Sequence, residues 1–264
     1  MFESNGRKTE KEEIKLIIAK AIDKYKLAIR NNKITFTDFL TGAEEAHVKK
    51  ALIENRINEY IKYGVKNDSD RSIIIFYPDK FSKEMVEANF SKILKVIRIT
   101  FPKNVSFEHR EILSGIMKLG IKREKFGDIV VYDSGADIII LDEVKKILVD
   151  GLKELTRFRK SEIEVIDIKD IYEKETEFDD LKIIISSNRL DNFVSELARC
   201  SRTKANEIIE EGRVLVNNIN ELKFSKKINV GDIITIRGKG KFIYDGEESK
   251  TRSDRIIVNI RKYK

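Results

Sequence analysis

Residues 188–218, NRLDNFVSELARCSRTKANEIIEEGRVLVNN, decide the fold of the C-terminal third of the chain. Apolar residues recur there at three- and four-residue steps in two successive segments, which predicts two short helices that each bury one face. These residues are Leu190, Phe193, Val194 and Leu197 in the first helix and Ala205, Ile208 and Ile209 in the second. Gly212 ends the second helix, because glycine adopts a left-handed conformation at no steric cost. Residues 214–216 then predict a strand, so a helix pair leads into a small sheet.

The second of these helices begins with cations. Ser201 is placed to cap it, and Arg202 and Lys204 lie in its first turn, where the helix dipole disfavours a cation by about 0.3–1 kcal/mol. The free N–H groups of a helix start bind phosphate, and nearby cations reinforce that binding. We therefore predict a phosphate contact here, extended by Arg199 and Arg213. The alternative is that these side chains turn into solvent.

A basic run interrupted by glycines follows a later predicted strand. It consists of Arg237, Gly238, Lys239, Gly240 and Lys241. Glycines between cations let the backbone approach an anion closely, and three charges can pair with successive phosphates. A solvated hairpin has the same composition, but beside a phosphate-binding helix we interpret the run as part of one interface.

The order of these residues resembles the S4 RNA-binding domain, which is named after a protein of the small ribosomal subunit. The matches are Arg189-Leu190-Asp191, Ser201-Arg202, Ala205, Ile209, Gly212, Val214, Val216-Asn217 and Val230-Gly231-Asp232-Ile233. Asn218 departs from the Gly that the family has there, which bears on the hairpin turn and leaves the fold in place. The resemblance implies that the helix start and the basic strands contact structured RNA. The predicted RNA-binding residues are Arg189, Arg199, Ser201, Arg202, Lys204, Arg213, Asn217, Arg237, Lys239 and Lys241.

Asp191 invites a catalytic interpretation, because a similar Gly-Arg-Leu-Asp motif carries the catalytic aspartate of pseudouridine synthases. Here Asn188 replaces the Gly, and the Thr and Gly that follow the aspartate in those enzymes are absent. We instead expect Asp191 to orient helix and strand through an ion pair with Arg189 or a cap. No catalytic residue is predicted.

The charge of the chain is unevenly distributed. Residues 181–264 contain 18 Lys and Arg against 11 Asp and Glu, whereas residues 1–180 contain 34 of each, so the net charge of +7 falls in the last third. A localised basic region is typical of a protein that binds a polyanion. A solubilising surface is the alternative.

The composition also argues against several classes of protein. No apolar run reaches the roughly 18 residues that a membrane span needs, and the charged N-terminus lacks the apolar stretch of a secretory signal. The single cysteine, Cys200, forms no internal disulfide and no metal site with two scattered histidines. We expect a cytoplasmic protein without a membrane partner, small-molecule substrate, metal or cofactor.

The rest of the chain predicts an α+β protein of three domains. Residues 1–70 are expected to be a helical N-terminal region, with a boundary at the polar turn 68–70. Residues 71–180 are expected to form an RRM-like α/β sandwich that begins with a strand over 72–77, and Ser106 is expected to cap its helix over 109–119. This region lacks the aromatic strand motif of base-stacking RRMs. Residues 181–264 form the S4-type domain, with two short helices and a small sheet.

A second resemblance is carried by residues 109–129, HREILSGIMKLGIKREKFGDI. They resemble the signature of the bacterial YlmH family, which combines an RRM-like domain with a C-terminal S4 domain. The resemblance implies binding to the large ribosomal subunit and peptidyl-tRNA, and a role in rescuing stalled ribosomes. Lys122, Arg123 and Lys125 are candidate phosphate contacts in the loop after Gly120; a solvated turn is the alternative.

Two other functions remain open at this level. An RNA-modifying enzyme of the pseudouridine synthase or methyltransferase type would require a catalytic or cofactor-binding motif in residues 1–180, and we find no such motif. A DNA-binding protein would use the second short helix for recognition, but Glu207, Glu210 and Glu211 oppose its approach to phosphate-lined grooves. An RNA-binding factor for rRNA and tRNA is the prediction that accounts for most residues.

Overall fold

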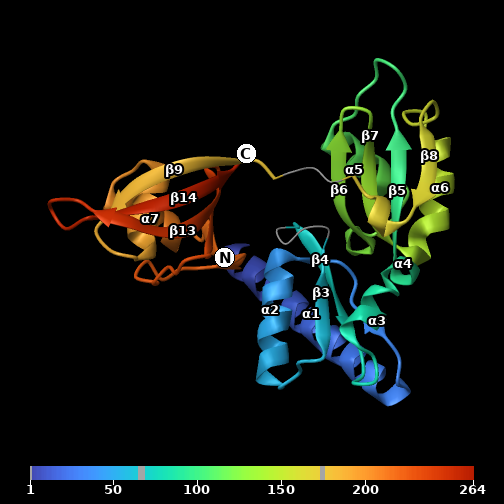
Figure 1. Ribbon diagram of the computed structural model, residues 1–264, viewed down its shortest axis with the longest axis horizontal. Coiled ribbons are helices and arrows are strands. Elements are labelled where there is room, and N and C mark those ends of the chain that lie inside the picture. The colour runs from blue at the N-terminus through green and yellow to red at the C-terminus, as the bar shows by residue number, and fades with distance from the viewer. Residues whose placement is uncertain (1, 65–68, 173–175) are drawn as a thin grey trace. The chain divides into compact units, whose positions relative to one another are not determined.

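The described residues form three β-sheets, which divide between two compact units, Met1–Lys174 and Glu175–Lys264 (Figure 1). The computed structural model describes residues 2–64, 69–172 and 176–264, and their side chains from Glu12 onward. The N-terminal region and the central region both belong to the first unit. The second unit contains the S4-type segment. Within the described residues, no helix is long and apolar enough to cross a membrane.

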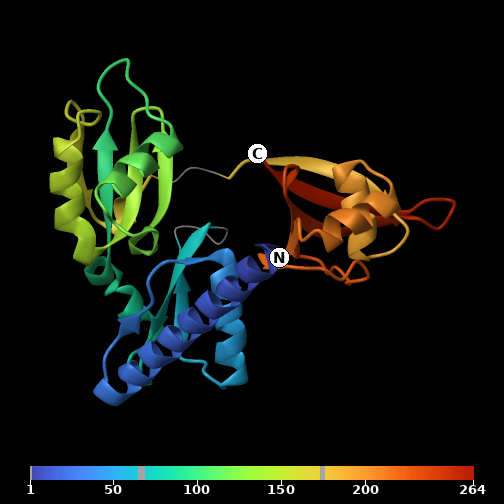
Figure 2. The same cartoon turned by 180° about the vertical axis from the view of Figure 1, so that it is seen from behind.

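The N-terminal region packs two helices on a small sheet. Its elements are α1 (Phe2–Asn31), β1 (Thr35–Phe36), β2 (Leu40–Thr41), α2 (Gly42–Glu54), β3 (Tyr60–Tyr63) and β4 (Arg71–Phe76). Figure 2 shows α1 and α2 side by side against the strands. Thr41 caps α2 in a capping box: its hydroxyl accepts from the amide of Glu44, and the Glu44 carboxylate accepts from the amide of Thr41. Such reciprocal capping satisfies two amides that the helix itself cannot.

The structure corrects two expectations for this region. Residues 1–70 are not only helical, because three short strands accompany the two helices. The strand predicted over 72–77 forms as β4, yet it pairs with β1, β2 and β3 rather than with the central sheet. Residues 73–76 are fully buried, as an apolar run between two layers must be. The predicted boundary turn begins at Asp68, which lies outside the described residues.

The central region has the strand order of an RRM. After the short helices α3 (Lys83–Glu87) and α4 (Phe90–Ile93), it contains β5 (Leu94–Thr100), α5 (His109–Lys118), β6 (Phe126–Tyr132), β7 (Gly135–Leu141), α6 (Lys145–Glu154) and β8 (Glu162–Ile166). The sheet runs β6-β7-β5-β8 and every neighbouring pair is antiparallel. Ile112 and Leu148 of the two helices pack on Ile97 and Ile138 of the strands. The predicted RRM-like fold is therefore confirmed, and its element order is βαββαβ.

The start of α5 differs from the prediction. Glu108, not Ser106, is the N-cap residue, and its amide donates to the Glu111 carboxylate at 2.9 Å. Glu111, three positions after Glu108, thus decides where the helix starts, because its carboxylate satisfies the amide of the N-cap residue and complements the helix dipole. Gly120 follows the helix end with a φ of +74°, a conformation that glycine adopts without strain.

The sheet face opposite α5 and α6 carries a buried charge. The side chain of Asp137 on β7 is fully buried and accepts two hydrogen bonds from Arg98 on β5, at 2.8 and 2.7 Å. It also accepts from the Tyr132 hydroxyl at 3.1 Å and the Tyr172 amide at 2.7 Å. Burial and the neighbouring carboxylate raise the pKa of Tyr132 to about 12. Residues 168–172 are thereby fixed across part of the face on which RRMs stack bases.

The first unit is held together where its two sheets meet. The Phe39 amide donates to the Glu124 carbonyl at 2.8 Å, and the Arg71 amide donates to the Asp128 carboxylate at 3.2 Å. Gly127 lies against the Phe39 ring so closely that a Cβ there would be 2.6 Å from a ring carbon. A side chain at residue 127 would therefore force Phe39 to move.

The second unit is a six-stranded antiparallel sheet with two helices on one face. Its elements are β9 (Phe178–Ile185), α7 (Leu190–Ala198), α8 (Arg202–Glu210), β10 (Val214–Val216), β11 (Ile219–Asn220), β12 (Ile233–Ile236), β13 (Gly240–Lys250) and β14 (Ile256–Tyr263). The sheet order is β11-β10-β12-β13-β14-β9. All the apolar residues predicted for the two helix faces pack in one core with the sheet. The predicted helix pair and its strand are confirmed.

Candidate RNA-binding surface of the second unit

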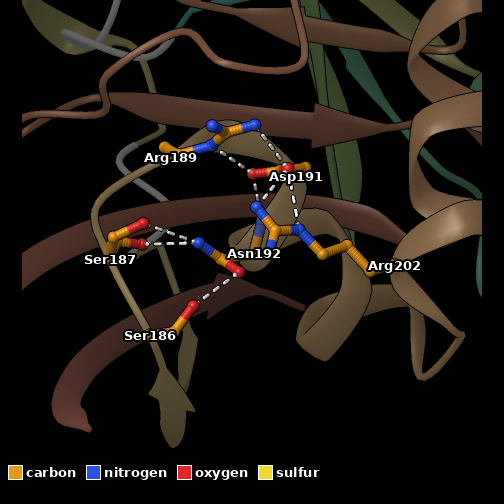
Figure 3. Close-up of polar contacts among 6 residues, drawn as sticks. All are labelled: Ser186, Ser187, Arg189, Asp191, Asn192 and Arg202. Atoms are coloured by element: carbon orange, nitrogen blue, oxygen red, sulfur yellow. Dashed lines mark hydrogen bonds and ion pairs between the residues drawn. The ribbon is translucent and has the colours of Figure 1, made fainter. Parts of the chain in front are cut away.

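Asp191 joins the starts of α7 and α8 (Figure 3). It is 1% exposed, and its carboxylate accepts hydrogen bonds from Arg189 at 3.1 and 2.9 Å and from Nε of Arg202 at 2.9 Å. Burial alone would raise the pKa of Asp191, but the two arginines outweigh burial and lower it. The predicted ion pair with Arg189 is confirmed. The aspartate is held as a buried anion between two guanidinium groups, which suits a positioning role.

The cationic first turn of α8 has a structural reason that the sequence alone did not reveal. Arg202 turns back to Asp191, eleven residues earlier, and Lys204 pairs with Glu207 at 2.7 Å. Ser201 caps the helix as predicted, accepting from the Lys204 amide at 3.2 Å. Arg202 and Lys204 are each 53% exposed in their side chains, so a phosphate can reach them, but their charges are already compensated.

Residues 221–227 form a loop that covers the start of α7. The Phe224 carbonyl accepts from the Asp191 amide at 3.1 Å, and the Lys226 carbonyl accepts from the Leu190 amide at 2.8 Å. Asn192 secures the other side of this helix start, because its side-chain NH2 group donates to the hydroxyl and the carbonyl of Ser187 (Figure 3). The first amides of α7 are therefore satisfied within the protein, whereas α8 has only the Ser201 cap and is the better anion site.

Asn217 has a structural role. Both Asn217 and Asn218 have positive φ, 51° and 66°, and they form a two-residue turn between the paired residues Val216 and Ile219. The Asn217 side chain donates to Asp232 at 2.8 Å and accepts from the Ile233 amide at 2.9 Å. Asparagine tolerates the left-handed conformation, so Asn218 replaces the expected Gly without loss of the turn. These bonds account for Asn217 without an RNA contact, which stays a prediction.

Seven further cations of the second unit form two groups. The hairpin group consists of Arg213, Arg237, Lys239 and Lys241, brought together because the Arg237 amide donates to the Arg213 carbonyl at 2.9 Å. The loop group consists of Lys223, Lys226 and Lys227, which are exposed and form no ion pair in the described part of the chain. The loop group is not among the residues predicted from the sequence, although three lysines fall within five positions there.

The boundary of the second unit changes the electrostatic argument. The unit begins at Glu175, and with residues 175–180 it contains 18 Lys and Arg against 15 Asp and Glu. Glu177 and Asp179 pair with Lys264, at 3.2 and 3.7 Å. The two units thus carry similar net charges, +3 and +4, so net charge does not distinguish them. The relevant feature is the set of cations near α8 that form no ion pair among the described residues; Arg213 is not one of them, because it pairs with Glu211 at 3.5 Å.

The candidate cations of the central region are largely engaged within the protein. Arg123 donates to the carbonyls of Phe126 and Gly127 at 2.7 and 3.1 Å, and burial, then repulsion from Arg71, lowers its pKa to about 10. Lys125 pairs with Asp38 at 2.8 Å and Glu143 at 2.7 Å. Lys122 is exposed. Arg123 and Lys125 therefore stabilise the first unit, which leaves Lys122 as the remaining candidate of the three. No cluster of potential metal ligands exists among the described residues.

Two models of known domains match the regions described above. Residues 86–171 match the model of the "Putative RNA-binding domain in YlmH", and residues 188–234 match the S4 domain model. The chain is thus an RNA-binding protein built from two modules, an RRM-like domain and an S4 domain. The chain is also 26% identical to the ribosome-associated protein quality control protein P2 of Bacillus subtilis (strain 168). The alignment spans 248 residues and covers 94% of each chain. Both matching models are those expected from the sequence resemblance to the YlmH family.

A solved structure is also similar. The cell division protein ylmH from Streptococcus pneumoniae has 23% sequence identity and a TM-score of 0.45, and the similarity covers 60% of this chain and 93% of that chain.

Proposed function

We propose that this protein is a non-catalytic cytoplasmic factor that binds rRNA and tRNA on the large ribosomal subunit and acts in ribosome-associated quality control. The cations around α8 carry the proposal, because they combine a capped helix start with unpaired charges on the S4 domain. The name of the Bacillus subtilis relative, which spans nearly the whole chain, supports the ribosomal setting. RNA backbone contact needs only phosphate-binding groups, and this surface provides them.

The proposed interface is a subset of the residues predicted from the sequence, with the loop group added. Arg199, Arg202 and Lys204 lie at the start of α8, and Arg189 lies beside them on Asp191. The hairpin group lies where α8 leads into β10. Because Arg189 and Arg202 also hold Asp191, we expect Arg199, Lys239 and the loop group to contribute most of the phosphate affinity.

A charge-neutralising double variant tests this placement. Arg199→Gln with Lys239→Gln removes two exposed, unpaired cations, and we expect its affinity for purified large ribosomal subunits to fall at least tenfold at physiological salt. Lys250→Gln with Arg252→Gln is the control of equal charge change, since both residues are exposed and lie at or just beyond the other end of β13, where Lys250 pairs with Asp254 at 3.0 Å. Equal binding of the double variant and the control in a sedimentation assay would refute the interface.

The absence of catalysis is tested separately. Incubation of the protein with tRNA and rRNA, followed by mass spectrometry of the nucleosides, is expected to reveal no new modification. A reproducible modification that is lost in a variant of the central region would replace the binding factor with an RNA-modifying enzyme.

A further inference from the structure

The loop over residues 221–227 leaves large apolar side chains in solvent. Leu222 is 52% exposed and Phe224 is 38% exposed, whereas Ile228, directly after the loop, is fully buried. The chain thus enters the core directly after the loop, whereas Leu222 and Phe224 remain outside it. Exposed apolar residues are ordinary when isolated. Here they alternate with cations, because Lys223, Lys226 and Lys227 belong to the same seven residues.

The position of Phe224 is fixed by the main chain. Its carbonyl accepts from the Asp191 amide, and the Lys226 amide closes a turn by donating to the Lys223 carbonyl at 2.9 Å. The Glu221 carboxylate accepts from the Lys223 amide at 2.9 Å. The ring is therefore presented from an ordered turn, and this turn does not have to become ordered when a ligand binds. Preorganisation of this kind lowers the entropic cost of binding.

The surroundings of the ring are cationic. The guanidinium of Arg189 lies 5.7 Å from the ring centre of Phe224. Arg189 also forms a β-bridge with Lys227, which ties the loop group to the Asp191 cluster. Glu221 is the only acidic residue among residues 221–227, against three lysines. A partly exposed ring in a loop with three exposed lysines, which form no ion pair among the described residues, suits an unstacked base flanked by phosphates, since bases stack on aromatic rings without regard to sequence.

We propose that Phe224 is a stacking site for an unpaired RNA base and that Lys223, Lys226 and Lys227 hold the phosphates beside that base. The proposal rests on the proposed RNA-binding function and deepens it. It predicts that the protein prefers RNA with unpaired nucleotides in a bulge or loop over fully paired RNA. Phosphate contacts alone would not create this preference, because both forms offer phosphates.

Binding to two RNA probes tests the proposal. One probe is an RNA hairpin with 2-aminopurine in its loop, and the other is a fully paired RNA of the same number of nucleotides. For the full chain, Phe224→Ala is expected to weaken binding to the hairpin about tenfold and to abolish the quenching of 2-aminopurine fluorescence. Binding to the paired probe is expected to change less than about twofold, because that probe offers only phosphate contacts.

Two variants serve as controls. Leu222→Ala removes a more exposed apolar side chain from the same loop, and Phe224→Tyr retains an aromatic ring; both are expected to bind the hairpin within about twofold of the native chain, because a ring remains available for stacking. Lys226→Gln with Lys227→Gln is expected to weaken binding to both probes and to reduce the salt slope by about 1.5. Thermal melting of each variant establishes that the second unit remains folded.

The outcomes separate this proposal from the proposed function. If the native chain bound neither probe nor the ribosomal subunit, the proposed function itself would fail. If the native chain bound but Phe224→Ala bound equally well and still quenched 2-aminopurine, the stacking site would be refuted. Unchanged RNA affinity with weaker sedimentation on ribosomal subunits would assign Phe224 to a protein contact and would also overturn the proposal.

Discussion

At the scale of single residues, two buried aspartates show how this chain uses arginine. Asp137 is paired with Arg98, whose side chain is 26% exposed, while Asp191 is shared by Arg189 and Arg202, which are 38% and 53% exposed. Removing one partner of a buried pair leaves the other charge unsatisfied, and the cost falls when solvent can reach that charge. The two sites therefore predict different costs for the same substitution.

We expect Asp137→Asn to lower the free energy of unfolding of the first unit by about 3 kcal/mol. Asp191→Asn is expected to lower that of the second unit by only about 1–2 kcal/mol, because water solvates the released arginines. Urea unfolding of the two variants measures both values. A larger loss at Asp191 than at Asp137 would contradict the argument from exposure.

The lowered pKa of Asp191 also predicts a pH dependence. A carboxylate whose folded pKa lies below its unfolded value, ordinarily about 3.9, stabilises the protein above that value and loses the contribution as the pH falls through the folded pKa. The stability difference between the native chain and Asp191→Asn is therefore expected to be full at neutral pH and to shrink below about pH 4. A difference that stayed constant down to pH 2 would contradict the role assigned to the two arginines.

The residues of this site could be predicted from the sequence more completely than the groups with which they form ion pairs and hydrogen bonds. The Arg189–Asp191 pair is predictable because two side chains so close in sequence at a helix start have few arrangements other than a direct contact. The pairing of Arg202 with Asp191 depends on how α7 and α8 pack, which periodicity does not specify. Arg123 shows the same limit, since its acceptors are main-chain carbonyls that only the folded loop brings within reach.

At the scale of elements, the turn between β10 and β11 gives a direct test of backbone conformation. Asn218 has a φ of 66°, where glycine is favoured and β-branched residues are strained. Asn218→Gly is expected to leave the stability of the second unit unchanged or raise it by about 0.5 kcal/mol. Asn218→Val is expected to lower it by about 1–2 kcal/mol. Thermal melting ranks the three proteins, and the order Val above Asn would refute the turn assignment.

The elements themselves were more predictable than their assembly. The helices α5, α7 and α8 and the hairpin of β6 and β7 follow from periodicity and turn residues. The membership of β4 does not, because an apolar run of residues 73–76 fits the middle of any buried sheet. The strands β1 and β2 are two residues long and carry no period at all.

At the scale of the whole molecule, the question is whether net charge or local geometry directs the chain to RNA. Net charge predicts equal binding by the two units, because they carry +4 and +3. Local geometry predicts that the second unit dominates, because it presents exposed cations beside both ends of α8 and in the loop group. The second unit has its own core, formed entirely by residues 181–260, so residues 175–264 are expected to fold alone.

We expect residues 175–264 to bind the RNA hairpin with a salt slope within about one counterion of the full chain. Residues 1–174 are expected to bind at least tenfold more weakly, because Arg123 and Lys125 are engaged within the unit. Titrations at several salt concentrations compare the three proteins. Equal affinities of the two units would show that net charge is sufficient and that the cations around α8 have no special role. A second unit that bound with the full slope but lower affinity would instead assign the missing free energy to uncharged contacts made by the RRM-like domain, since salt dependence reports only the phosphates that a protein neutralises.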